Sequence, residues 1–225
     1  MNSIGEQINK LKKDLPKRVT LVAVSKTKPV EIIMEAYEAG HRIFGENKVQ
    51  ELVSKYEVMP KDIEWHLIGH LQTNKVKYIA GFVKLIHSVD SLKLLQAIDE
   101  EGKKNNRIID CLLQLKIAKE ESKFGIALPE VYSLLQSDSF KSLNNVSIRG
   151  VMGMATFTSD LQQVRDEFRT LKTIFDKLQA EYFKNDGTFS EISMGMSDDY
   201  SIAIEEGSTI VRVGSKIFGD RIYNK

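Results

Sequence analysis

The sequence predicts a single parallel (β/α)8 barrel, and three observations point to this α/β fold. Short apolar segments alternate with amphipathic helical segments along the chain, and eight such pairs can be counted. The length of 225 residues lies within the range of one barrel. No linker, low-complexity tract or shift in composition divides residues 1–225, so one domain is expected. An open doubly wound sheet is the alternative, but such sheets usually stop at about five or six strands.

The eight predicted strands are runs rich in β-branched and other apolar residues. In a parallel sheet covered on both faces, strands are nearly continuous in apolar residues because neither face meets water. The predicted strands cover residues 20–26, 42–46, 64–69, 83–89, 107–116, 146–154, 189–194 and 209–213.

The helices are predicted from apolar residues at spacings of three and four and from start and stop signals. Ile4, Ile8, Leu11 and Leu15 predict an opening helix that ends before Pro16. Seven helices are then predicted between strands and one at the end of the chain. The first four cover 32–37 with a stop at Gly40, 49–56, 73–80, and 91–102 with Ser91 as N-cap. A fifth starts at Pro129, after a loop containing Ser122, Lys123, Phe124 and Gly125. The others are 161–182, the longest, with Leu161 on its apolar stripe, then 197–207, and a short segment after Ser215.

Composition gives no reason to expect a charged macromolecular partner. The chain has 32 Lys and Arg against 31 Asp and Glu, so neither nucleic acid nor an anionic membrane is an expected partner. No apolar run approaches membrane-spanning length and the N-terminus does not resemble a signal peptide, so a cytoplasmic protein is expected. The single Cys111 cannot form an internal disulfide, and its strand setting predicts a buried small apolar residue.

The first strand places one cation at its carboxyl end, where barrel enzymes build their sites. Its apolar run ends in Ser25 and Lys26. Burial disfavours the ammonium form of such a lysine and lowers its pKa, which leaves a nucleophilic amine that can form a Schiff base with an aldehyde. A lysine that only extends into solvent is the alternative from this segment alone. Lys28 is a rival, but its position before Pro29 favours a solvated role.

The segments that follow strands seven and eight predict a phosphate site. Residues 193–197 and 214–215 combine glycine and serine, and each segment precedes a helix. Glycine lets backbone amides approach an anion, serine adds donors, and barrels commonly hold phosphate in these two loops. The alternative is that Ser197 caps a helix whose first turn carries Asp198 and Asp199, and that Gly214 is a plain turn residue.

The alternation of side chains along the strands brings a third group towards this site. It places Arg212 and Gly214 on one face of strand eight and Val24 and Lys26 on one face of strand one. A cofactor with an aldehyde for Lys26, a phosphate for the glycine-serine segments and an aromatic nitrogen for Arg212 is pyridoxal 5′-phosphate. An arginine at the pyridine nitrogen would keep that nitrogen unprotonated and make the ring a weaker electron sink.

Other candidate residues are less specific. Asn47 and His66 lie at or just beyond strands two and three, where pocket residues are expected, although His66 fits a hydrogen-bonded core position equally well. The remaining histidines have no acidic or thiol neighbours at ligand spacing, so no metal site is expected. Four methionines are expected to provide barrel packing and an apolar wall for the cofactor: Met152, Met154, Met194 and Met196.

Seven motifs, in order over nearly the whole chain, resemble those of the pyridoxal phosphate homeostasis protein family, also called the YggS or proline synthetase co-transcribed homologue family. The first and sixth are highly specific together. The motifs are LVAVSKTKP at 21–29, FGEN at 44–47, EWHLIG at 64–69, LQTNK at 71–75, GVM at 150–152, SMGMSDD at 193–199 and RVGSKIFG at 212–219.

This resemblance implies a barrel like the N-terminal domain of alanine racemase, with the cofactor as an internal aldimine on Lys26. It implies that Arg212 faces the pyridine nitrogen and that Asn47 lies beside the ring. Ser215 stands where many relatives have threonine, and both residues supply a hydroxyl. Phosphate contacts are implied for Ser193, Gly195, Met196, Ser197, Gly214 and Ser215.

The family is regarded as a carrier or regulator of free pyridoxal phosphate, so the resemblance implies a role in vitamin B6 homeostasis, with apo forms of dependent enzymes as transient partners. An amino-acid racemase-type enzyme with weak or narrow activity is the alternative. Racemisation needs a base on each face of the substrate Cα, and neither Tyr200 nor Tyr223 can be assigned opposite Lys26. Without a second domain to pair, a monomer that holds the cofactor is expected.

Overall fold

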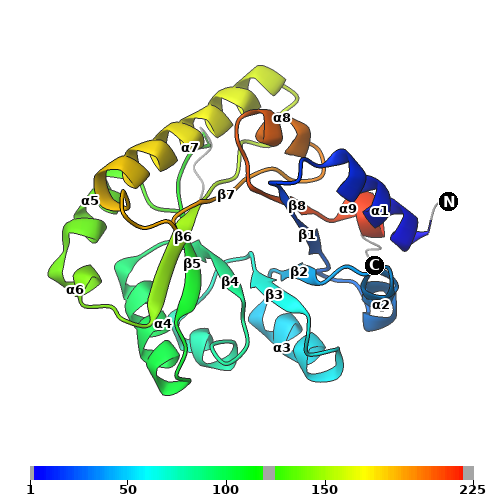
Figure 1. Cartoon of the computed structure of the whole chain (residues 1–225), viewed down its shortest axis with the longest axis horizontal. Coiled ribbons are helices and arrows are strands. Elements are labelled where there is room, and N and C mark those ends of the chain that lie inside the picture. Colours follow the sequence, from blue (N-terminus) through cyan, green and yellow to red (C-terminus); the bar gives the residue numbers. More distant parts are fainter. Residues whose placement is uncertain (1–2, 119–124, 220–225) are drawn as a thin grey trace.

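The structure, a computed structural model, describes residues 3–118 and 125–219. Within them, eight parallel strands follow one another in chain order and close into a barrel, because β8 pairs with β1 (Figure 1). This arrangement confirms the predicted (β/α)8 fold. The strands are β1 (Thr20–Val24), β2 (Ile43–Glu46), β3 (Glu64–Leu67), β4 (Leu85–Val89), β5 (Ile109–Gln114), β6 (Val146–Met152), β7 (Glu191–Ser193) and β8 (Ile210–Val213).

Helices surround this barrel on the outside (Figure 1). The α-helices are α1 (Ile4–Asp14), α2 (Val30–Glu38), α3 (Val49–Val58), α4 (Leu92–Lys104), α5 (Leu128–Gln136), α6 (Asp138–Lys141), α7 (Leu161–Tyr182), α8 (Tyr200–Glu205) and α9 (Ser215–Phe218), and a 3₁₀ helix, η1, covers Thr73–Tyr78.

Local signals explain where several helices begin or end. Ser3 and Glu6 form a capping box at α1, and the Ser91 hydroxyl accepts from the Leu94 amide at α4. Left-handed glycines follow α2 and α8, as the sequence predicts, at Gly40 (φ +83°) and Gly207 (φ +99°).

Three helical predictions are corrected. The segment at Thr73–Tyr78 is a 3₁₀ helix of one to two turns, a form that proteins use for short connections. Gly102 lies inside α4 instead of ending it, and its role is to permit a close contact, since a Cβ there would lie 2.9 Å from the Arg107 carbonyl oxygen. Leu161, expected on the apolar stripe of α7, is 61% exposed. The predicted loop residues Ser122, Lys123 and Phe124 lie outside the described residues, as does Tyr223.

The apolar core has two parts. The larger part lies between the strands and the helices and includes the fully buried Cys111, as predicted. The smaller part fills the barrel interior with Val22, Leu85, Leu112, Met152 and Ile210. Polar side chains also lie in this interior, directly below the functional site.

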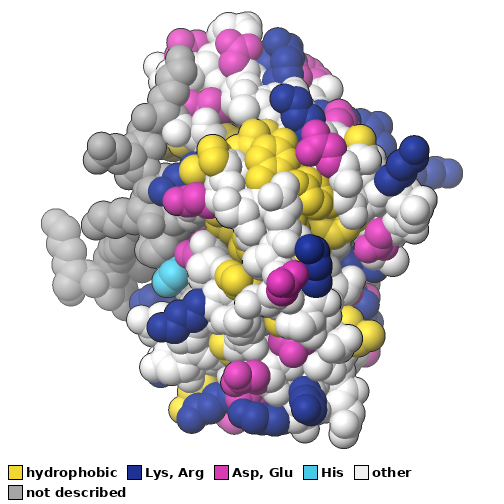
Figure 2. Space-filling model, turned by 90° about the vertical axis from the view of Figure 1, so that its left-hand side faces the viewer, with side chains coloured by type: hydrophobic (Ala, Val, Ile, Leu, Met, Phe, Trp, Pro, Cys, Tyr) yellow, Lys and Arg dark blue, Asp and Glu magenta, His cyan; other side chains and the backbone are white. Residues whose placement is uncertain are grey.

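The surface carries charges of both signs. Lysine and arginine side chains are interspersed with aspartate and glutamate over the face shown in Figure 2. In the part of the chain that the structure describes, no helix has both the length and the apolar character needed to cross a membrane.

Candidate functional site

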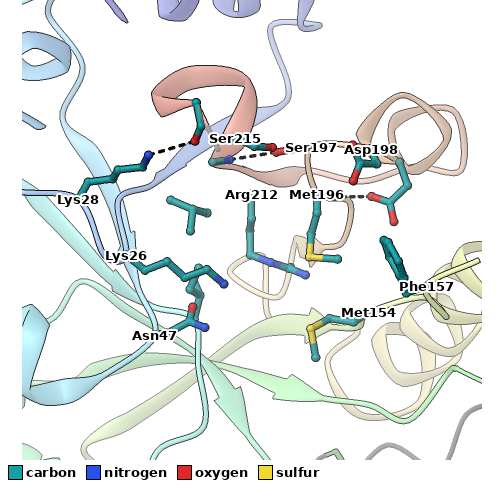
Figure 3. A pocket seen from close by; sticks show the side chains of 15 residues that line it. Lys26, Lys28, Asn47, Met154, Phe157, Met196, Ser197, Asp198, Arg212 and Ser215 are labelled. Atoms are coloured by element: carbon teal, nitrogen blue, oxygen red, sulfur yellow. Dashed lines mark hydrogen bonds between the residues drawn. The ribbon is translucent and has the colours of Figure 1, made fainter. Parts of the chain in front are cut away.

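A cavity of about 380 Å³ opens at the carboxyl ends of the strands (Figure 3). Residues after β1, β2, β3, β6, β7 and β8 line it, so the site is built where a barrel is expected to have one. The lining residues are Val24, Lys26, Lys28, Asn47, Ile68, Met154, Phe157, Met196, Ser197, Asp198, Asp199, Arg212, Gly214, Ser215 and Gly219.

Lys26 extends into this cavity from the turn that follows β1. The strand itself ends at Val24, so Lys26 is two residues beyond it, and its side chain is half-buried instead of buried. In Figure 3 the end of the Lys26 side chain lies beside Asn47 and points towards the middle of the cavity, into which Arg212 also points. The predicted neighbourhood of lysine and arginine is therefore present.

Lys28, the rival candidate, is held at the edge of the cavity. Its Nζ donates to the carbonyl oxygens of Phe218, at 2.8 Å, and Gly219, at 3.1 Å. These bonds tie the segment after β1 to the end of α9. Lys28 thus has a structural task, whereas the Lys26 amine lies towards the cavity centre.

Arg212 lies in the middle of β8, opposite Val22 of β1, and is 4% exposed. Its Nη1 donates to Ser193 Oγ at 2.6 Å and its Nη2 to the Gly153 carbonyl oxygen at 3.3 Å. Burial lowers the pKa of Arg212 to about 10, and the nearby Asp199 carboxylate opposes this shift. Arg212 is therefore still a cation and a hydrogen-bond donor at neutral pH.

Two buried histidines continue from Arg212 through the barrel interior. His87 Nδ1 lies 2.9 Å from Ser193 Oγ, and His87 Nε2 lies 2.9 Å from His66 Nδ1. Burial lowers the pKa of His66 to about 3. Burial, a proton on His66 when one is present, and the Arg212 charge hold the pKa of His87 well below its usual value. Both imidazoles are neutral at pH 7. His66 also lines a separate hollow of about 220 Å³ at the amino ends of the strands.

Four residues that were expected at the cofactor do not line this cavity. Ser193 and His66 lie inside the barrel, hydrogen-bonded to one another through His87, and neither lines the cavity. Met152 packs in the interior apolar cluster. Gly195 (φ +92°) faces α8, where a Cβ would lie 2.6 Å from Ala203 Cβ. The sequence pattern could not separate residues at the cavity from residues one layer below it.

The two glycine-serine segments meet at the cavity, as predicted. The Gly214 amide donates to Ser197 Oγ at 3.2 Å, and Ser215 lies beside them. The residue in the N-cap position of α8 is Asp199, so Ser197 does not have the capping role considered as an alternative. The Asp199 carboxylate instead accepts from the Met196 amide at 2.5 Å; burial raises the pKa of Asp199, against the effect of this bond.

Asn47 owes its position to a close approach between two loops. A Cβ at Gly69 would lie 2.3 Å from the Asn47 carbonyl oxygen, so only glycine allows the segments after β2 and β3 to meet. Tyr200, considered as a second proton carrier, is the first residue of α8 and does not line the cavity.

The sequence reasoning missed several residues around the site. Phe157, 89% exposed, carried no signal in the sequence and lines the cavity, next to Met154, which was expected in its apolar wall. Lys55 is buried below the Lys26 turn. Its position three residues after Leu52, on the apolar face of a helix, is the signal that could have revealed it. In the described residues, no group of three or more His, Cys, Asp or Glu could hold a metal ion.

Comparisons with known proteins agree with this architecture. The family model for the N-terminal domain of alanine racemase matches residues 1–222. A pyridoxal phosphate homeostasis protein from Aquifex aeolicus (strain VF5) is 43% identical over 204 residues, which cover 90% of this chain and 87% of the relative.

Solved structures show the same similarity. PipY from Synechococcus elongatus, solved with PLP bound, superposes with a TM-score of 0.87 at 36% identity, covering 96% of this chain and 100% of the PipY chain. Alanine racemase from Bartonella henselae superposes with a TM-score of 0.67 at 16% identity, covering 97% of this chain and 60% of the racemase chain. At that identity, the racemase supports the fold alone.

Proposed function

The chain belongs to the pyridoxal phosphate homeostasis protein family, built on the alanine racemase N-terminal domain, and from this premise we propose that it binds pyridoxal 5′-phosphate (PLP) on Lys26 and buffers or delivers it. PipY, which is similar over its full length, was solved with PLP bound. One observation carries the proposal for this chain: Lys26, Arg212 and the Ser197, Gly214 and Ser215 segments line a single cavity.

The donors in the cavity fit the three polar ends of this cofactor. When bound, PLP supplies an aldehyde that reacts reversibly with a lysine amine. The hydroxyls of Ser197 and Ser215 are suited to bind the phosphate, and Gly214 leaves room beside them. Val24, Ile68 and Met196 provide apolar contacts for a ring.

Arg212 and Asn47 are proposed to orient the ring. Because an arginine with a pKa of about 10 keeps its protons at neutral pH, Arg212 can only donate to the pyridine nitrogen and would leave it unprotonated. Asn47 lies next to the end of Lys26 and is proposed to contact the ring on that side. Both residues bind and orient, which suits a protein that holds its cofactor.

The binding proposal is tested by absorption spectroscopy and chemical trapping. Purified protein mixed with PLP is expected to gain a visible or near-ultraviolet band that borohydride converts into a stable label on Lys26, located by peptide mass spectrometry. Lys26→Ala should lose the band and the label, whereas Lys28→Ala should keep both on Lys26. A colourless wild type that takes up no PLP would overturn the proposal.

A second experiment separates a carrier from a racemase-type enzyme. Exchange of the α-hydrogen of amino acids into deuterated water, followed by NMR over a panel of amino acids, is expected to stay far below enzyme rates. Transfer of PLP to an apoenzyme, followed through the activity that the apoenzyme regains, is expected to be efficient. Rapid exchange that disappears in Lys26→Ala would support the enzyme alternative instead.

We further propose that the whole chain acts as one domain and as a cytoplasmic monomer, with neither nucleic acid nor membrane as a partner. The near balance of 32 basic and 31 acidic residues supports the choice of partners. The buried Cys111, whose thiol pKa is raised by burial, suits a reducing compartment. Light scattering with size-exclusion chromatography tests the monomer, and a mass twice that of the chain would contradict it.

A further inference from the structure

A buried group of charged residues lies behind the Lys26 turn, and the proposed function does not use it. It consists of three residues: Glu46 at the end of β2, and Glu51 and Lys55 on α3. We call these three residues the α3 charge cluster. Glu46 is fully buried and Lys55 is 5% exposed. Oε2 of Glu46 has no hydrogen-bond partner among the described residues.

Lys55 binds the residue on one side of Lys26. Its Nζ donates to the Ser25 carbonyl oxygen at 2.9 Å, to Glu46 Oε1 at 2.8 Å and to Glu51 Oε1 at 2.7 Å. The Ser25 hydroxyl also donates to Glu46 Oε1, at 2.6 Å. Backbone and side chain of Ser25 are thus both fixed by the cluster.

Glu51 binds the residue on the other side of Lys26. The Thr27 amide donates to Glu51 Oε1 at 2.6 Å. Thr27 has φ +64°, in the left-handed region that β-branched residues rarely adopt, so the turn needs such a contact to persist. Lys26 therefore lies between two residues that the same cluster holds in place.

The cluster is a poor means of gaining stability alone. A buried ion pair costs desolvation energy that apolar residues of similar volume avoid, and here one carboxylate oxygen lacks a partner. Charged groups do give directional contacts. Among the described residues, the hydrogen bonds that the side chains of the cluster form with other residues all reach the Ser25 to Thr27 turn.

We propose that Glu46, Glu51 and Lys55 are positioning residues that fix the Lys26 turn so that the amine meets the aldehyde end of the cofactor. This inference rests on the proposed function and deepens it. The cluster does not line the cavity, and its side-chain bonds go to Ser25 and Thr27, so its direct contacts are with the Lys26 turn and not with the ring and phosphate positions.

Two ligands separate these contributions. PLP reacts with the lysine amine, whereas pyridoxine 5′-phosphate has an alcohol in place of the aldehyde and depends only on the ring and phosphate contacts. Glu51→Ala and Lys55→Met are expected to weaken PLP retention about tenfold or more, because displacement of a reacting group by about 1 Å is costly. The Kd for pyridoxine 5′-phosphate is expected to stay within about twofold of the wild type.

The controls use the same helix. Glu57→Ala removes an exposed carboxylate of α3 and should change neither affinity. Glu51 is half-buried, so Glu51→Ala should fold even if Lys55→Met does not.

Equal weakening of both ligands in Glu51→Ala, or no change in either, would overturn the positioning role. If the wild type binds pyridoxine 5′-phosphate but gains no borohydride-stable label with PLP, the proposed function fails separately.

Discussion

Nη1 of Arg212 donates to Ser193 Oγ at 2.6 Å, inside the barrel and one layer below the cavity. Since an arginine can only donate, Ser193 accepts this bond and can donate its own proton to His87 Nδ1. In the tautomer that accepts at Nδ1, His87 carries its proton on Nε2 and donates to His66 Nδ1. With this tautomer the hydrogen bonds run in one direction from the cavity to the opposite end of the barrel. The bonds from Arg212 to Ser193 Oγ and to the Gly153 carbonyl oxygen fix the plane of its guanidinium.

Ser193→Ala is expected to loosen Arg212 without removing it. The guanidinium loses one buried acceptor, which should lower the free energy of unfolding by about 1–3 kcal/mol. PLP affinity should fall several-fold and the absorption band of the bound cofactor should shift, because the donor at the ring is no longer fixed. Titration with PLP, followed by absorption spectroscopy, measures the affinity and the position of the band.

Ser208→Ala is the matched control for Ser193→Ala. Ser208 is equally buried, but the acceptors within reach of its hydroxyl are the carbonyl oxygens of Ile192, Met194 and Ile210, and it does not contact Arg212. The Ser208→Ala variant should have a lower free energy of unfolding and an unchanged cofactor band. The same spectral shift in both variants would contradict a specific effect of Ser193.

Arg212→Ala is expected to weaken PLP binding by about tenfold or more, since a charged, buried donor at the ring is lost. Ser193 and Gly153 each lose a donor, so a decrease in stability of about 1–3 kcal/mol should accompany it, and the barrel should remain folded by circular dichroism. Arg149→Ala, at the hollow on the opposite end, should leave PLP affinity unchanged. Unchanged affinity in Arg212→Ala would remove this residue from the site.

The barrel could be predicted because its signals are local. Each strand is a short apolar run, each helix repeats its apolar residues at helical spacing, and Ser91 or Gly207 marks an end within a few residues. Alternation along β1 and β8 also predicted that Lys26 and Arg212 meet at one site, and both line the cavity. This prediction succeeds because it needs only the order of the strands.

The rest of the site depends on contacts that no local pattern contains. The interior path from Ser193 to His66 joins β7, β4 and β3, and its form depends on how these strands are staggered. Lys55 reaches the Ser25 carbonyl oxygen across 30 residues of sequence. The sequence pattern could place each residue on an element but could not show which polar groups meet below the cavity.

Stability is expected to fall as the pH drops below about 6.5, because buried histidines must stay neutral in the folded protein. The pKa of His66 is lowered to about 3 and that of His41 to about 4, in both cases mainly by burial. The unfolded chain, with histidine pKa near 6.5, binds more protons in this window, so the free energy of unfolding rises with pH. For each of these histidines, the free energy of unfolding changes by up to about 1.4 kcal/mol per pH unit between its folded pKa and about pH 6.5. Above about pH 6.5 the histidine adds no further change with pH.

Urea unfolding between pH 7.5 and 5 tests this dependence. His66→Gln should flatten the dependence of the unfolding free energy on pH. A pH-independent free energy of unfolding would contradict the neutral state of the buried histidines.

Gly195→Ala is expected to damage the phosphate segment between β7 and α8. Gly195 has φ +92°, which strains any L side chain, and a Cβ there would lie 2.6 Å from Ala203 Cβ and 2.9 Å from Tyr200 Cα. The segment must shift, which moves Met196 and Ser197 at the cavity and should lower stability by about 1–3 kcal/mol. Scanning calorimetry should record this loss of stability, and titrations should show weaker binding of both PLP and pyridoxine 5′-phosphate.

Gly187→Ala is the control. With nothing within 4 Å of the added Cβ, its free energy of unfolding should stay within about 0.5 kcal/mol of the wild type. Wild-type affinity for both ligands in Gly195→Ala would show that this segment does not hold the phosphate.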